Sequence, residues 1–148
     1  MTAVSVWVAT LGMSFLSGFV PLVNIEAYLL GAAALLPGIS PLVVVVPAAL
    51  GQMAAKAVLF LGGRGLVNLP LRFRDRALAA AARLGTRRPP ALVFTSALTG
   101  LPPFYVVSVA AGMLGFRPGL FLVAGLAGRL LRFGAVFALP GLLAWVIS

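Results

Sequence analysis

The sequence predicts an all-α integral membrane protein that forms a single membrane domain over residues 1–148, and three observations lead to this prediction. Hydrophobic residues make up 62% of the chain and charged residues 9%, whereas charged residues are roughly 25% of soluble globular domains. Two apolar segments are interrupted by proline, glycine and polar residues, and they resemble each other at a fixed spacing. Most of the positive charge falls in one short stretch between them.

The first interrupted segment runs from Ser17 to Ser40 and reads SGFVPLVNIEAYLLGAAALLPGIS. A plain spanning helix needs about 20 continuous apolar residues and gains nothing from a carboxylate at its middle. Irregular backbone at membrane depth is tolerated only where protein or a water-filled cavity satisfies its hydrogen bonds. We therefore expect a re-entrant helical hairpin that carries Asn24 and Glu26 toward a polar site. The alternative is an ordinary helix whose end holds both side chains at the membrane interface. The residues expected to shape the hairpin are Pro21, Gly31, Pro37 and Gly38.

The second interrupted segment, Thr99 to Gly119, repeats this pattern 81 residues later. Duplicated broken segments in two halves of a chain point to a transporter-type site between repeats. We therefore expect two repeats, residues 1–63 and 90–148, each made of a re-entrant hairpin followed by a transmembrane helix. The positions that correspond between the two segments are Pro21 with Pro102, Gly31 with Gly112, Pro37 with Pro118 and Gly38 with Gly119. The residues expected to shape the second hairpin are Gly100, Pro102, Pro103 and Gly112.

Two further segments are continuous enough to span a bilayer. The first is Pro41 to Leu61, in which Gln52 and Lys56 are four residues apart and should share a face that looks into protein. The second is Phe116 to Ser148. Residues 2–19 are also uncharged, and the sequence leaves open whether they span or form the first arm of the hairpin.

A basic linker, residues 64–89, separates the two repeats. Its only acid is Asp75, and its arginines are Arg64, Arg72, Arg74, Arg76, Arg83, Arg87 and Arg88. A short loop this rich in arginine is expected on the cytoplasmic side, which would make the two repeats inverted, with their hairpin tips near the midplane. The stretch LRFRDRALAAAARLG predicts an amphipathic helix along the membrane surface, with Leu71, Leu78 and Ala82 on one face and arginines toward anionic headgroups. Membrane topology thus accounts for the net charge of +9, and no nucleic-acid partner is expected.

Glu26 is one of two acids in the chain and the only one in an apolar stretch. A buried carboxylate must be neutral, paired or hydrated. The functional hypothesis is a residue that binds a proton or senses a headgroup. The alternative is a structural ion pair with Lys56, Arg129 or Arg132, and the two are compatible because titrating ion pairs couple protons in membrane carriers.

Arg129 and Arg132 lie on one face of the last apolar segment. Arg129 follows Pro118 by 11 residues, or about 16 Å of helix, which is near the middle of a bilayer core about 30 Å thick. Planar guanidinium groups suit phosphate, so the hypothesis is phosphate binding. The alternative is snorkelling toward an interface or capping of hairpin carbonyls. Lys56 is a further candidate for phosphate binding, and the alternative is that its long stem reaches the cytoplasmic surface.

The residues that the chain lacks bear on catalysis. Without cysteine or histidine, and with two acids, neither a Ser-His-Asp triad nor a carboxylate-bound catalytic metal can be assembled. We therefore expect no enzyme activity, no metal and no cofactor.

Three motifs, FVPLVNIEAYLLGAA, GLPPFYVVSVAAG and GRLLRF, together resemble the DedA or VTT-domain superfamily, also called the SNARE-associated Golgi protein family, from about Ser17 to Phe137. The resemblance implies two opposed re-entrant hairpins packed with spanning helices, and a role in moving lipids across the bilayer. It implies undecaprenyl phosphate or phospholipid as substrate, often with dependence on the proton-motive force. By position, Glu26 matches the acid of the family's first hairpin. The family's second hairpin carries arginines around its proline, and here Arg129 and Arg132 are the candidates to replace them.

The sequence as a whole therefore predicts a flippase or scramblase for an anionic phospholipid or polyprenyl phosphate in a bacterial cytoplasmic membrane. The partners expected are membrane lipids with anionic headgroups, held by Arg129 and Arg132 while Glu26 exchanges a proton or pairs with the cations. Proton coupling and a homo-oligomeric state are left open. The alternatives are a proton-coupled transporter of a small solute and a non-transporting scaffold or assembly protein.

Overall fold

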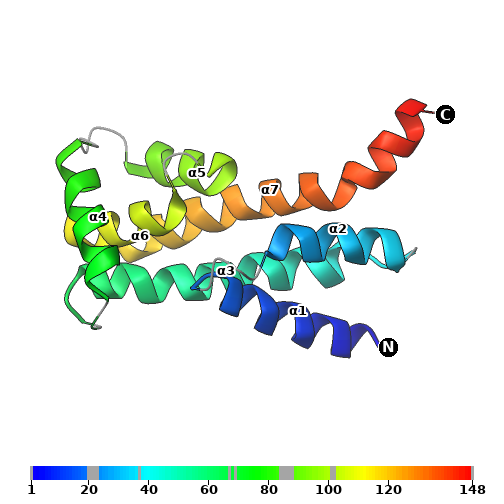
Figure 1. The fold of residues 1–148 in the computed structure, drawn as a ribbon, viewed down its shortest axis with the longest axis horizontal. Helices are drawn as coiled ribbons and strands as arrows, with labels where there is room; N and C mark the ends of the chain where they lie inside the picture. Colours follow the sequence, from blue (N-terminus) through cyan, green and yellow to red (C-terminus); the bar gives the residue numbers. More distant parts are fainter. Residues whose placement is uncertain are drawn as a thin grey trace. The chain divides into compact units, whose positions relative to one another are not determined.

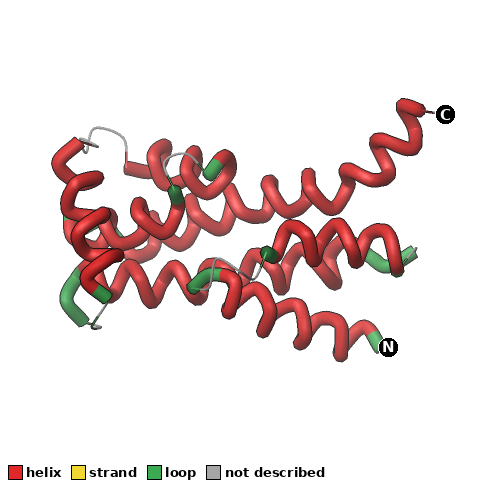
Figure 2. Tube along the Cα trace, viewed as in Figure 1, coloured by secondary structure: helices red, strands yellow, loops and turns green. Residues whose placement is uncertain are grey.

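A computed structural model of the protein describes residues 2–19, 24–36, 38–66, 68, 70–83, 89–100 and 103–147. Throughout these residues the fold is helical, and loops occur only between helices (Figures 1 and 2). The predicted all-α class is confirmed for this part of the chain. The helices are α1 (Ala3–Ser17), α2 (Ile25–Leu35), α3 (Pro41–Gly63), α4 (Leu71–Arg83), α5 (Pro89–Thr99), α6 (Phe104–Met113) and α7 (Pro118–Ile147).

Among the described residues, two helices are long and apolar enough to cross a membrane. They are α3, with 23 residues, and α7, with 30, and they coincide with the two continuous segments predicted to span. The other apolar helices, α1, α2, α5 and α6, have 15, 11, 11 and 10 residues. At 1.5 Å per residue each of these is at most about 23 Å long, which is too short to cross a core of about 30 Å.

The chain divides into two compact units. The first unit comprises Met1–Gln52 and Leu130–Ser148, and the second comprises Met53–Arg129. Both boundaries fall inside long helices, so α3 and α7 each contribute one part to the first unit and one part to the second. The division into a repeat over 1–63, a linker over 64–89 and a repeat over 90–148 stays a prediction.

In the first unit, α1 and α2 contact each other and run in opposite directions (Figure 1). The hydroxyls of Thr10 and Tyr28 share a hydrogen bond of 2.8 Å between the two helices. Among the described residues of the segment from Ser17 to Ser40, α2 is the one helix that lies wholly inside it, and the antiparallel neighbour of α2 is α1. Residues 3–17 are therefore helical but shorter than a bilayer span.

Polar side chains also join α1 to the first part of α3. The Ser14 hydroxyl donates a hydrogen bond to the carbonyl of Ala48. The Gln52 amide donates to the Ser17 hydroxyl at 2.9 Å. Gly51 allows this approach, because a Cβ there would lie 2.5 Å from the carbonyl oxygen of Leu11.

The second unit is built around α6, which contacts α4 and α5. Glycines let α6 approach α3 closely, since a Cβ on Gly112 would lie 2.0 Å from the Phe60 carbonyl oxygen and one on Gly63 would lie 2.1 Å from the Val109 carbonyl oxygen. The Phe121 ring of α7 stacks on the Phe60 ring with centroids 4.7 Å apart. The core of this unit is thus aromatic, with backbone close to backbone.

The residues expected to shape hairpins fall into two groups. Gly38 and Gly100 have φ values of +85° and +77° at helix ends, a conformation that favours glycine, and Pro103 directly precedes α6. Gly31 and Gly112 instead lie inside α2 and α6. Both helices continue through them, so neither glycine bends the chain. Pro21, Pro37 and Pro102 lie outside the described residues.

Candidate functional site

Asn24 determines where α2 begins and therefore where Glu26 lies. The Asn24 Oδ1 accepts hydrogen bonds from the backbone N–H groups of Glu26 at 3.0 Å and Ala27 at 3.2 Å, which makes it the N-cap of the helix. Glu26 consequently occupies the first turn, where the helix dipole stabilises a carboxylate. The sequence placed Asn24 among the ligand-binding candidates, whereas here its side-chain oxygen caps the helix that presents Glu26.

Glu26 forms an ion pair with Arg132 inside the first unit. The Arg132 Nε donates to the Glu26 Oε1, and the two side chains are 26% and 33% exposed, respectively. Of the three cations that the sequence offered as partners, the fold selects Arg132, which lies at the middle of α7. The pair is half-buried, so attraction between the charges offsets part of the free energy lost when they leave water.

A second cluster lies in the second unit and consists of two basic residues, Lys56 and Arg129, and the aromatic ring of Phe104. Lys56 is only 6% exposed, and its ammonium group is close enough to the Arg129 guanidinium for their like charges to interact. The Arg129 guanidinium lies 4.8 Å from the centroid of the Phe104 ring, within the range of a cation–π interaction. We call these three residues the cationic cluster.

The burial of Lys56 answers one question that the sequence left open. Gln52 is 5% exposed and Lys56 6% exposed, so the prediction that this face of α3 looks into protein is confirmed. Lys56 does not reach a surface by extending its stem. The second unit contains one acid, Asp75, and that side chain is exposed on α4.

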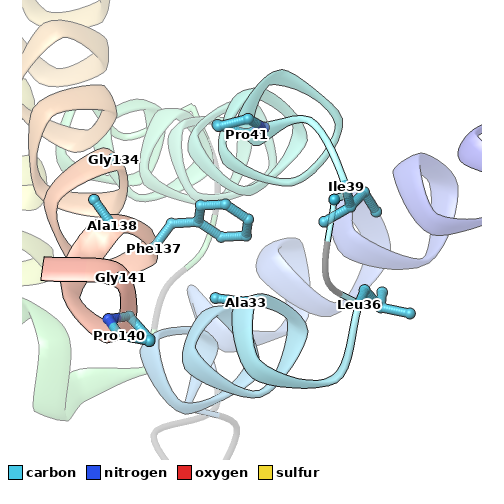
Figure 3. Close-up of a pocket in the computed structure, with 10 residues that line it drawn as sticks. Ala33, Leu36, Ile39, Pro41, Gly134, Phe137, Ala138, Pro140 and Gly141 are labelled. Atoms are coloured by element: carbon cyan, nitrogen blue, oxygen red, sulfur yellow. The ribbon is translucent and has the colours of Figure 1, made fainter. Parts of the chain in front are cut away.

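The first unit also contains a groove of about 290 Å³ with an apolar lining, which we call the apolar groove. Leu36, Ile39 and Pro41 line it from the end of α2 and the start of α3, and Phe137 and Pro140 line it from α7 (Figure 3). The side chains drawn around it are all hydrocarbon. Reasoning from sequence missed this groove, although small residues at Gly134, Ala138 and Gly141 line it at helical spacing on α7 and were a usable signal.

Two arginines of the basic stretch make contacts that the sequence did not predict. The Arg64 guanidinium donates to the carbonyl of Phe116 and lies 5.0 Å from the centroid of the Phe60 ring. The Arg76 Nη1 donates to the Tyr105 hydroxyl of α6 at 2.6 Å. Both arginines thus attach the basic stretch to the core of the second unit.

Comparisons of the chain with protein-family models, with curated proteins and with solved structures find no match. The resemblance to the DedA superfamily therefore rests on the three sequence motifs and stays a prediction.

Proposed function

We propose that the protein is an integral membrane protein that translocates an anionic lipid, either a phospholipid or a polyprenyl phosphate, across the bilayer. The observation that carries this proposal is the cationic cluster, in which Lys56 is buried on α3 and the partly buried Arg129 of α7 lies over the Phe104 ring. Removing like charges from water costs several kcal/mol unless an opposite charge compensates. A phosphate group would bring a negative charge to this cluster, and guanidinium matches the geometry of its oxygens.

The lengths of the helices support the membrane part of the proposal. Two short apolar helices followed by a long one occur before α4, and the same order occurs after it. Short apolar helices in contact, as α1 with α2 and α5 with α6, have the lengths expected of re-entrant hairpins. Polar side chains on long apolar helices, with short apolar helices beside them in both halves, are the pattern of transporter repeats.

The apolar groove favours a lipid over a small polar solute. Its lining of leucine, isoleucine, proline and phenylalanine offers no hydrogen-bond partner from a side chain and suits an acyl or prenyl chain. In this proposal the hydrocarbon tail stays in apolar surroundings throughout, and only the headgroup needs polar contacts.

The ion pair of the first unit links the proposal to protons. Glu26 and Arg132 are both partly exposed, so neither side chain is sealed inside the protein. Protonation of Glu26 from bulk water removes its negative charge, and Arg132 then lacks its carboxylate partner and can hold a headgroup phosphate. Loss of the proton to water restores the pair and displaces the phosphate.

The experiment that tests the proposal measures lipid flip in proteoliposomes with fluorescent phospholipid and polyprenyl-phosphate probes. Wild type is compared with Lys56→Met and Arg129→Met, and Arg117→Gln is the matched control because Arg117 is exposed just before α7. We expect each cluster variant to slow flip roughly tenfold or more, equivalent to about 1.4 kcal/mol of barrier, and the control to match wild type. Thermal unfolding of each variant verifies that it is folded.

The alternatives predict other outcomes in the same vesicles. Solute counterflow without lipid movement would identify a solute transporter. Well-folded wild type that flips no anionic lipid, or flip that is unchanged in both cluster variants, would overturn the proposal. Dependence of flip on an imposed pH gradient, and its loss in Glu26→Gln, would separate a proton-driven carrier from a scramblase.

A further inference from the structure

Helix α4 differs in direction from the other helices of the second unit. It runs crosswise to α6 and to the last part of α3, whereas those two run along the long axis of the view (Figure 1). It begins eight residues after α3 ends at Gly63, which is a reach of at most about 29 Å at 3.6 Å per residue. If α3 crosses a membrane, α4 is therefore both close to one membrane face and oriented along it.

The structure also fixes which side of α4 is available to a partner. Ala77 is fully buried, α4 contacts α6, and Arg76 donates to Tyr105 of α6. Leu71 and Leu78, seven residues apart and so nearly aligned on the helix, are 73% and 57% exposed. The protein thus turns one side of α4 inward and leaves two large apolar side chains uncovered on another.

Three of the four arginines of α4 fall on a third side of the helix by their spacing, while the exposed Arg74 and Asp75 flank the leucine edge. Positions 72, 76 and 83 share a side by helical spacing and all carry arginine. At 100° per residue, position 76 lies about 160° around the helix from position 78. An uncovered leucine edge opposite an arginine edge is the arrangement of a helix that lies in a membrane interface.

We propose that α4 is an interfacial helix that binds anionic phospholipid headgroups, with Leu71 and Leu78 inserted below them and the arginine edge at their level. Seven arginines and one aspartate over residues 64–88 give this stretch the charge that complements an anionic surface. The two exposed leucines favour a membrane over a nucleic acid, which offers no apolar layer. The proposal concerns a different surface from the cationic cluster, and it would concentrate anionic lipid at one membrane face.

The test uses the full-length protein in nanodiscs, because the chain contains no cysteine and single cysteines can be labelled cleanly. A fluorophore is attached to Leu78→Cys and, as the matched control from the opposite edge, to Arg76→Cys. Val123→Cys on α7, 71% exposed, reports on a position in a predicted span. Lipids brominated in their acyl chains quench fluorophores that enter the hydrocarbon.

We expect at least twofold stronger quenching at Leu78→Cys than at Arg76→Cys. We also expect stronger quenching at Leu78→Cys in anionic than in zwitterionic discs, and loss of that difference at high salt, because salt screens the arginines.

Quenching at Val123→Cys with none at Leu78→Cys would overturn the proposal while leaving the spanning helices and lipid translocation intact. Equal quenching at positions 76 and 78, or quenching at 78 that ignores lipid charge, would also overturn it. An unquenched Leu78 label that responds to added RNA would assign the arginines to nucleic acid.

Discussion

Among the described glycines, close contacts between helices are more frequent in the second unit of the molecule than in the first. In the second unit, Gly63, Gly112 and Gly128 lie against the backbone of a neighbouring helix, where an added Cβ would lie 2.1, 2.0 and 2.8 Å from the nearest backbone oxygen. In the first unit, Gly51 makes one such contact with α1, but Gly31 and Gly134 have no atom of another residue within 4 Å of such a Cβ. Glycine in the second unit brings helices together, whereas these glycines of the first unit leave open space.

The charged side chains differ between the units in a parallel way. The first unit pairs Glu26 with Arg132, and both are partly exposed. The second unit places Lys56 and Arg129 near each other in its packed part. A closely packed unit holds charged groups at fixed distances, as a binding site requires, and a more open unit can exchange one pairing for another. On the proposed function, the second unit therefore offers a fixed headgroup site, and the first unit offers Arg132 when its pairing with Glu26 changes.

The largest difference between the units is expected for two phenylalanines of α7. Phe121 is 1% exposed and stacks on Phe60, so Phe121→Ala should lower the free energy of unfolding by about 3–5 kcal/mol. Phe137 is half-buried beside the apolar groove, and Phe137→Ala should cost about 1 kcal/mol. Denaturation with SDS in mixed micelles measures both, and equal losses would show that the two units are packed equally well.

The glycine contrast itself predicts the next effect. Gly112→Ala forces a Cβ against the Phe60 carbonyl and should destabilise the protein by about 1–3 kcal/mol through overpacking. Gly31→Ala is the matched control, because it fills open space in a helix and should stabilise by up to about 1 kcal/mol. Opposite shifts in thermal midpoint would sharpen the comparison. A neutral Gly112→Ala would mean that α3 and α6 separate easily.

The ion pair of the first unit should contribute less than either of these packing contacts. Removing one partner of a fully buried pair costs about 3–5 kcal/mol, but Glu26 and Arg132 are 33% and 26% exposed. Glu26→Ala should therefore destabilise by about 1–2 kcal/mol once solvent screening is included. The doubly reversed variant Glu26→Arg with Arg132→Glu should recover at least half of the loss. If each reversal alone is harmless, the pair has no structural role.

Sequence reasoning succeeded where a property is local to its segment. The length and apolarity of α3 and α7, and the alanine-rich composition of α4, are readable residue by residue, and these helices formed as predicted. The sequence offered three cations to Glu26, and only the three-dimensional fold selects Arg132. Gly31 and Gly112 look equivalent at matching positions of two apolar segments. They differ only because Phe60, far away in sequence, packs on one of them.

The smallest predicted effects concern two tyrosine hydrogen bonds, one in each unit. Tyr28→Phe removes the hydroxyl that bonds to Thr10 at 2.8 Å and should cost about 0.6 kcal/mol, the average for polar contacts between helices in membranes. Tyr105→Phe, which removes the exposed contact with Arg76 in the second unit, should cost less, about 0–0.5 kcal/mol, because water replaces the lost bond. A double-mutant cycle with Thr10→Val isolates the coupling, and additive effects of Thr10→Val and Tyr28→Phe would show that the two hydroxyls do not hold α1 against α2. Since α1 and α2 are each too short to span a bilayer alone, a measurable coupling here would mean that side-chain hydrogen bonds help to keep this helix pair together.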